Sequence, residues 1–217
     1  MKVTLQIPTL NEAESLPRVL EQVPRQAVDE ILVVDGHSSD KTREIAESLG
    51  CRVILQPDKG YGNAMKFGFS KAIGDIIISM DADGSPNPQE IPKLLAKINQ
   101  GYDLVLGSRY LPGGGSQDDT FIRRFGNKIF TWFTNLRHGS NFSDSLYLFA
   151  AMKKEMLLNL DLKSEDFALC IEILVKAHKQ RYKIGEVPCF ERARFASDSR
   201  VNALIDGIKI LWQLLWW

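Results

Sequence analysis

The chain has 217 residues, a length that fits one α/β domain with or without a short appendage and disfavours two full domains. Lys and Arg number 27 and Asp and Glu number 27, so the net charge is zero and the composition does not point to a nucleic-acid binder. Hydrophobic residues make up 44% of the chain, which is enough for a packed core and excludes a wholly disordered protein.

Cysteine usage and the apolar runs indicate a cytoplasmic protein. The three cysteines are too few and too scattered for a disulfide scaffold or a CxxC metal site, which fits a reducing compartment. The first residues, MKVTLQIPTLNEAE, lack the apolar core of a signal peptide. Because no apolar run of about 18 residues occurs, we expect no membrane-spanning segment.

The first half of the chain alternates short apolar runs with helical patterns. Helices are expected from residue 12, capped by Asn11, and from residue 41, capped by Ser39 or Asp40. The expected ranges are 3–7, 31–35, 52–56, 75–80 and 103–107 for strands, and 12–23, 41–49, 61–72 and 88–99 for helices. This alternation predicts an α/β fold in which helices cover both faces of a mostly parallel sheet.

Ligands of such sheets bind beyond the carboxyl ends of the strands. In this chain, that rule selects four candidate site segments, which are 8–12, 35–40, 81–85 and 107–110.

The pattern changes after residue 110. Residues 111–120, LPGGGSQDDT, are Gly-rich and polar, so we expect a mobile loop there. The remaining expected elements are helices at 121–136, 167–179 and 200–217 and strands at 146–152 and 183–187, the last ending before Pro188. We therefore expect one domain over 1–200, followed by an amphipathic helix over 201–217.

The strongest local signal is the motif MDADG at 80–84. Asp81 and Asp83 flank one small residue directly after the most apolar strand, so a turn there lets both carboxylates face one bound cation. Two carboxylates suit Mg²⁺ or Mn²⁺, which share such sites with phosphate oxygens. A turn whose aspartates cap the next helix is the alternative, and the position at a strand end favours the cation site.

The segment IPTLNEAES at 7–15 contains no glycine. A dinucleotide site needs G-x-G-x-x-G at this position, so an NAD enzyme is disfavoured. Asn11 and Glu12 either meet a base or ribose or cap the following helix.

Two further segments have features of a nucleotide site. In VVDGHSSDKT at 33–42, Asp35 either accepts a hydrogen bond from a ribose or base, or stabilises a turn. In PDKGYGNAMKFGF at 57–69, two glycines allow close backbone approach and Lys59 is placed to meet a phosphate. This last segment is not a Walker A loop, since GK[ST] is absent.

Taken in order, these segments resemble family 2 glycosyltransferases of GT-A fold, especially the dolichol-phosphate mannosyltransferase-like branch that uses polyprenyl phosphates. The matching segments are PTLNEAE, VVDGHSSDKT, KGYGNAMKFGF, MDADG, GSRY (107–110), the segment around Asp144, EVP (186–188) and R-x-x-S-x-S-R (194–200). The chain departs from the family at 34–38, where VDGHS replaces VDDGS. The resemblance covers residues 7 to about 200 and is specific for fold and reaction type, not for the sugar.

The resemblance implies roles for individual residues. It implies a nucleotide pocket formed by Pro8, Leu10, Asn11, Glu12, Asp35, Lys59, Asp81 and Ala82, and a divalent metal, Mg²⁺ or Mn²⁺, held by Asp81 and Asp83. Catalytic roles fall on Asp83 and on Arg109, which would face the donor diphosphate and the acceptor phosphate. Arg123 and Asn127, four residues apart on one helical face, match the pair that meets the lipid phosphate.

The implied function is an inverting, metal-dependent transfer of a sugar from a nucleotide-diphosphate donor to a polyprenyl phosphate (dolichyl or undecaprenyl). A phosphate acceptor is already an anion near neutral pH, so the reaction needs no strong general base. Two alternatives stay open, a hydroxyl acceptor with Asp144 as base and a nucleotide-sugar-binding pseudoenzyme at a membrane. A processive polysaccharide synthase is disfavoured, because the chain has no Q-x-x-R-W motif.

The C-terminal residues 201–217, VNALIDGIKILWQLLWW, have apolar side chains at helical spacing and three tryptophans suited to the headgroup boundary. We expect this helix to lie on the cytoplasmic face of a membrane, where the lipid acceptor is found. A core or dimer helix is the alternative, and a partner membrane subunit or a homo-oligomer is left open.

Overall fold

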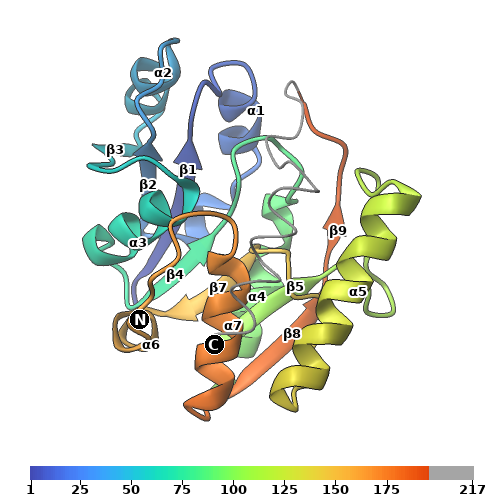
Figure 1. Ribbon diagram of the computed structural model, residues 1–217. Helices are drawn as coiled ribbons and strands as arrows, with labels where there is room; N and C mark the ends of the chain where they lie inside the picture. The colour runs from blue at the N-terminus through green and yellow to red at the C-terminus, as the bar shows by residue number, and fades with distance from the viewer. Residues whose placement is uncertain (196–217) are drawn as a thin grey trace.

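The computed structural model describes residues 1–195 (Figure 1). The expected final helix at 200–217, and with it the proposed unit 201–217, lies outside the described residues.

Seven strands form the central sheet in the order β3-β2-β1-β4-β7-β5-β8. All neighbouring strands are parallel except in the two pairs made by β7, which runs antiparallel to both β4 and β5. The strands are β1 (Val3–Thr9), β2 (Glu30–Asp35), β3 (Arg52–Leu55), β4 (Ile76–Ser79), β5 (Leu104–Ser108), β7 (Ala150–Lys153) and β8 (Ile184–Pro188). The prediction of a mostly parallel sheet is confirmed.

Helices cover both faces of this sheet, because its central strands are apolar on both sides. Strand β4 shows this directly, with all four of its side chains buried. One face packs against α1 (Leu16–Glu21), α2 (Thr42–Ser48) and α4 (Ile91–Ile98). The other face packs against α3 (Tyr61–Lys71), α6 (Lys154–Asn159) and α7 (Leu169–Lys179). Short 3₁₀ turns lie at Arg25–Ala27 (η1) and Pro88–Glu90 (η2).

Helix α5 (Phe121–His138) forms an outer layer beside α7 (Figure 1). It packs through Phe130 and Phe133 against a small cluster that includes Ile171 and Val175. Thr120 caps the start of the helix, since its side chain accepts a hydrogen bond from the Arg123 N–H, and the left-handed Gly139 follows its last residue, as is common for helices.

A second, two-stranded sheet joins the segment after β5 to the end of the described chain. Strand β6 (Gly115–Ser116) pairs in parallel with β9 (Phe190–Glu191). The segment 111–120 therefore contains a strand that the sequence did not predict, and its expected mobility stays a prediction.

Several expected boundaries are wrong. The first helix begins at Leu16 rather than at residue 12, because Asn11 has a left-handed φ of 53° and its side chain accepts from the Ser39 N–H at 2.8 Å instead of capping the helix. The expected helix at 88–99 is divided into η2 and α4, the expected strand at 146–152 is limited to β7, and α6 was not predicted.

Candidate active site

A cavity of about 700 Å³ opens at the carboxyl ends of β1, β2, β3 and β4. This is the position that the parallel sheet predicts for a ligand. The lining residues come from the loops after these strands, from the start of α3 and from two distant segments. They are Pro8, Thr9, Leu10, Glu12, Gly36, His37, Gln56, Lys59, Gly60, Tyr61, Ala64, Asp81, Ala82, Asp83, Phe167 and Arg194.

The turn after β4 brings Asp81 and Asp83 to one wall of this cavity. The Asp83 carboxylate accepts a hydrogen bond from the Ser85 N–H at 2.9 Å, which fixes the turn. Gly84 has a φ of +86°, and a Cβ at this position would lie 2.4 Å from the Phe195 ring, so the turn requires glycine. The Phe195 N–H donates to the Asp83 carbonyl oxygen at 2.9 Å, so the end of the described chain closes over this turn.

The two carboxylates repel each other in a partly desolvated place. Burial and the nearby charge of Asp83 raise the pKa of Asp81 to about 7. The Tyr61 hydroxyl donates to Asp81 Oδ1 at 3.1 Å, and Arg194 Nε lies 3.4 Å from Asp83 Oδ2. The positive charge of Arg194 therefore already lies next to the two carboxylates.

The carboxylate pair fits a divalent metal as two ligands of a larger set. Hard carboxylate oxygens are the donors that Mg²⁺ and Mn²⁺ prefer, and a bound cation would relieve the repulsion that raises the Asp81 pKa. Within residues 1–195, no group of three or more His, Cys, Asp or Glu side chains is placed to hold a metal. The remaining ligands would therefore come from water or from a phosphate-bearing substrate, as is usual for Mg²⁺.

An aromatic pair lies next to the carboxylates, since the Tyr61 hydroxyl bonds to Asp81. The rings of Tyr61 and Phe167 stack at 4.4 Å with an interplanar angle of 20°. Phe167 follows a loop that is fixed by the buried Glu172. The Glu172 carboxylate accepts hydrogen bonds from the N–H groups of Lys163 and Ser164 in this loop. The sequence did not identify Phe167 as a site residue.

The glycines at the start of α3 allow this same loop to pack closely against the helix. A Cβ on Gly60 would lie 2.3 Å from the Glu165 carbonyl oxygen, and one on Gly62 would lie 2.5 Å from the Ser164 carbonyl oxygen. Their close approach is therefore to the protein backbone, which allows the loop and the aromatic pair to sit beside Lys59 at the cavity.

Two predicted nucleotide residues do not line the cavity. Asp35 is fully buried, and its carboxylate accepts from the Ser38 N–H at 2.9 Å and from the Thr9 hydroxyl at 3.1 Å. Asn11 is bonded to Ser39, as described above. Both side chains bond within the loops that present Gly36 and His37 to the cavity. Asp35 stabilises a turn, the alternative that the sequence offered for it, whereas Asn11 does not cap the first helix, and a nucleotide contact by either residue stays a prediction. Pro8, Leu10, Glu12, Lys59, Asp81, Ala82 and Asp83 do line it.

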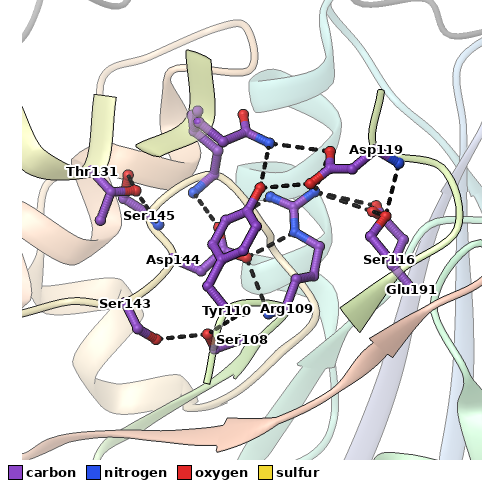
Figure 2. A network of polar contacts seen from close by, with 12 residues as sticks. Ser108, Arg109, Tyr110, Ser116, Asp119, Thr131, Ser143, Asp144, Ser145 and Glu191 are labelled. Atoms are coloured by element: carbon purple, nitrogen blue, oxygen red, sulfur yellow. Dashed lines mark hydrogen bonds and ion pairs between the residues drawn. The ribbon is translucent and has the colours of Figure 1, made fainter. Parts of the chain in front are cut away.

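A second polar network lies beside the cavity, around Arg109 (Figure 2). The buried Arg109 guanidinium donates to both oxygens of Asp144, with Nε–Oδ2 at 2.8 Å and Nη2–Oδ1 at 3.0 Å. Its Nη1 donates to Glu191 Oε2 at 3.2 Å and lies 3.9 Å from Asp119 Oδ1. Arg109 does not line the cavity, and its contact with a donor diphosphate stays a prediction.

Arg123 and Asn127 share the inner face of α5, as their spacing predicted. Arg123 Nη1 lies 2.8 Å from Asp118 Oδ2, and Asn127 Nδ2 donates to the Tyr110 hydroxyl at 3.0 Å. Tyr110 in turn donates to Asp119 at 2.6 Å. Neither Arg123 nor Asn127 lines the cavity, so these two residues form a separate polar place next to it.

Asp118 connects the two places. Its Oδ2 also lies 3.2 Å from Arg194 Nε, and Arg194 reaches Asp83, so ion pairs run from Arg123 through Asp118 and Arg194 to Asp83. The sequence motif at 194–200 contained Arg194, but nothing in it assigned this side chain to the cavity.

Comparisons with known proteins agree with this geometry. The family model described as Glycosyl transferase family 2 matches residues 4–161. An uncharacterized glycosyltransferase of Mycobacterium tuberculosis is 33% identical over 205 residues, which cover 94% of this chain and 92% of the relative. The dolichol-phosphate mannosyltransferase of Pyrococcus furiosus is 32% identical over 229 residues, which cover 100% of this chain and 64% of that protein. A dolichyl-phosphate hexose transferase of Haloferax volcanii is 30% identical over 204 residues, with 93% and 87% covered.

Solved structures share the fold. The glucosyl-3-phosphoglycerate synthase of Mycobacterium tuberculosis, in complex with Mn²⁺, UDP and phosphoglyceric acid, matches with a TM-score of 0.78 at 19% identity, covering 98% of this chain and 78% of that one. The fold is therefore that of the GT-A glycosyltransferases, and the chain belongs to glycosyl transferase family 2. It is an enzyme of the glycosyltransferase class. Among the described residues, none of the helices has the length and apolar character needed to cross a membrane.

Proposed function

We propose that this enzyme transfers a hexose, with inversion, from a nucleotide-diphosphate sugar to a polyprenyl phosphate. The observation that carries the proposal is the line of ion pairs that joins the carboxylate wall of the cavity to Arg123 on α5. It connects a place suited to a metal and a diphosphate with a place suited to a second phosphate. The relatives named for dolichol-phosphate mannose and dolichyl-phosphate hexose transfer support this choice of acceptor.

The cavity supplies what a nucleotide-sugar donor requires. Tyr61 and Phe167 offer an apolar surface, and Lys59 offers a positive charge for a phosphate. Asp81 and Asp83 would hold a divalent metal, Mg²⁺ or Mn²⁺, which when bound would stabilise charge on the leaving diphosphate. The complexes of the glucosyl-3-phosphoglycerate synthase with Mn²⁺ or Mg²⁺ and UDP support this cofactor.

The acceptor side consists of Arg123 and Asn127, with Arg109 behind them. Arginine binds phosphate through two parallel N–H donors, a geometry that lysine lacks. Arg123 now pairs with Asp118, and Asn127 donates to Asp119 at 3.4 Å, so an acceptor phosphate would replace a carboxylate as the partner of each rather than meet a bare charge. Positioning and electrostatic stabilisation would then account for most of the rate.

A phosphate acceptor also agrees with the state of Asp144. A hydroxyl acceptor would need a base, and Asp144 is fully buried with both carboxylate oxygens bonded to Arg109. It would have to leave that arginine before it accepted a proton. We therefore place the hydroxyl-acceptor alternative second.

A donor screen tests the proposal. Release of nucleoside diphosphate is followed for a set of nucleotide sugars with Mn²⁺, in the presence of polyprenyl phosphate, of 3-phosphoglycerate, or of no acceptor. We expect release that depends on polyprenyl phosphate and on the metal, and formation of a glycosylated lipid phosphate. Turnover with 3-phosphoglycerate alone would support the hydroxyl acceptor instead, and donor binding without any turnover would support the pseudoenzyme. The enzyme is proposed to work at the cytoplasmic face of a membrane, where such a lipid phosphate is found.

A further inference from the structure

Helix α5 exposes an unusual amount of apolar surface. Six of its side chains, called here the α5 stripe, are among the large apolar side chains that stand in solvent in the described part of the chain. They are Phe121 (85% exposed), Ile122 (80%), Phe125 (59%), Ile129 (44%), Trp132 (62%) and Leu136 (66%). Single exposed apolar residues are normal, whereas a contiguous group of this kind marks an interaction surface.

The α5 stripe occupies one side of the helix. With 3.6 residues per turn, its six positions fall within an arc of about 100°. The buried Thr131 and Thr134 lie on the opposite side, which packs against the protein. The stripe therefore runs along the whole outer surface of α5, and within residues 1–195 it has no covering element.

The charged side chains of α5 itself are all positive. Helix α5 contains no Asp or Glu, although the chain as a whole has equal numbers of acidic and basic residues. Arg124 and Lys128 are exposed along one edge of the stripe, and Arg137 is exposed beyond the other edge. An apolar centre with cationic edges and a tryptophan is typical of a helix that lies in the interface of an anionic membrane.

A second copy of the chain fits this surface poorly. A symmetric contact would place the same patch on both copies, so that cationic edges would face cationic edges. Helix α5 has no carboxylate with which to pair them.

We infer that the α5 stripe is a membrane-docking surface for lipids with anionic headgroups. The apolar side chains would enter the headgroup and acyl boundary, while Arg124, Lys128 and Arg137 would contact lipid phosphates. Arg123 and Asn127 point to the opposite side of the same helix, about 10 Å away across its diameter. Docking would thus hold the acceptor side of the site next to the membrane; this purpose rests on the proposed function, but the docking itself does not.

Vesicle binding tests the inference without any substrate. The full chain is sedimented with vesicles of phosphatidylcholine alone or mixed with phosphatidylglycerol, which contain no polyprenyl phosphate. Compared with the unaltered chain, F125S/W132S should weaken partition into the mixed vesicles by about tenfold or more, because two large apolar side chains no longer enter the lipid. R124E/K128E should remove the preference for phosphatidylglycerol. Leu158→Ser is the matched control, since Leu158 is 57% exposed on α6 and outside the stripe.

Trp132 reports the contact directly. A chain in which Trp212, Trp216 and Trp217 are replaced by Phe keeps Trp132 as its single tryptophan, and its emission should shift to shorter wavelength when mixed vesicles are added. Unchanged partition of F125S/W132S, or no shift of Trp132 emission, would overturn the inference. The inference would also be overturned if the unaltered chain is a dimer in solution, F125S/W132S is a monomer, and both bind vesicles equally. The α5 stripe would then be covered by a second copy of the chain. Sugar-transfer activity has no bearing on these readings, so a failure here leaves the proposed function untouched.

Discussion

Asp83 differs from Asp81 in its surroundings, since its carboxylate is tied to the Ser85 N–H and approached by Arg194. Asp83→Asn keeps an oxygen for the Ser85 hydrogen bond and removes the charge of one proposed metal ligand. We expect the Mn²⁺-dependent affinity for a nucleotide-sugar donor to fall by at least about tenfold, with the fold intact. Calorimetric titration of donor with and without Mn²⁺ measures this, and Asp161→Asn, at an exposed position on the link between α6 and α7, is the control. Equal affinity in Asp83→Asn would refute the metal assignment.

Arg123 and Arg124 are neighbours that face different directions, which makes them a matched pair. Arg123→Ala should raise the KM for a short, water-soluble polyprenyl phosphate by the equivalent of about 1.5–3 kcal/mol, the usual worth of a charge-assisted hydrogen bond, and leave the donor KM unchanged. Arg124→Ala should alter neither, because Arg124 is exposed on the outer side of α5. Steady-state kinetics with both substrates varied are the measurement. A rise in donor KM alone would show that Arg123 serves the donor.

Arg109 also has a structural role, which any test of catalysis must take into account. Its guanidinium neutralises Asp144 and Glu191 inside the protein, and burial raises the pKa of Glu191 even with this partner. Arg109→Ala should therefore lower the free energy of unfolding by about 3–5 kcal/mol, because two carboxylates would lose their counter-charge. The double variant Arg109→Ala/Asp144→Asn should recover part of the loss. Urea unfolding gives both values, and a loss below about 1 kcal/mol in the single variant would contradict this role.

Among the elements, those with a strong local pattern were predictable. The apolar runs of β2 and β4 are buried on both faces and follow from the sequence alone. The late start of α1 does not, since it depends on a hydrogen bond between Asn11 and a loop that follows the next strand. The antiparallel direction of β7 also depends on how the second half of the chain returns to the sheet, which no short window of sequence contains.

Some residues of the candidate site were likewise predictable from the sequence, and others were not. Asp81 and Asp83 were predictable because they follow a strand whose carboxyl end lies at the ligand-binding edge of the sheet, and Lys59 because it lies beside two glycines in a loop. Phe167 and Arg194 reach the cavity through tertiary packing, by a ring stack on Tyr61 and by backbone pairing next to Asp83. Such contacts between distant segments have no local signature, so the sequence could not assign either residue to the site.

The end of α5 gives a pH-dependent prediction. Burial, together with Lys179, Arg137 and His178, lowers the pKa of His138 to about 4. In the unfolded chain this imidazole takes up its proton near pH 6.5. Between these values only the unfolded state is protonated, so stability is lost as the pH falls from 6.5 to 4, while above pH 7 the residue has no effect.

His138→Gln removes this titration. We expect the free energy of unfolding to fall less between pH 7 and pH 4.5 in His138→Gln than in the unaltered chain, by about 1 kcal/mol after allowance for solvent screening. Urea unfolding at the two pH values gives the difference. His37→Gln, at an exposed turn, serves as control, and an identical pH dependence in all three proteins would reject the prediction.

At the scale of the whole molecule, the line of ion pairs from Arg123 to Asp83 predicts that donor and acceptor binding influence each other. A metal and donor bound at Asp83 would compete with Arg194, and Arg194 and Arg123 share Asp118. Asp118→Asn should let a phosphate reach Arg123 without competition, raising acceptor affinity by about two- to fivefold in the absence of donor, as expected for a partly exposed ion pair. It should also reduce the effect of donor on acceptor affinity, since coupling is reciprocal.

Titration of the short acceptor with and without donor plus Mn²⁺ measures both quantities, and Asp161→Asn again provides the comparison. If Asp118→Asn binds the acceptor as the unaltered chain does, with the same response to donor, then Asp118 does not couple the two places.

The position of β7 has a consequence for how this protein is made. Strands β4 and β5 do not pair with each other; each pairs with β7, which is synthesised after both. A growing chain can therefore assemble the half-sheet β3-β2-β1-β4 early, with the cavity loops already at its edge, while the three isoleucines of β4 stay at an open edge. An uncovered apolar edge of this kind attracts other strands. Strand β7 therefore covers the exposed edge of β4, the most apolar strand of the sheet. The ribosome delivers β7 only when about two thirds of the chain has been synthesised, so the edge of β4 stays exposed until then.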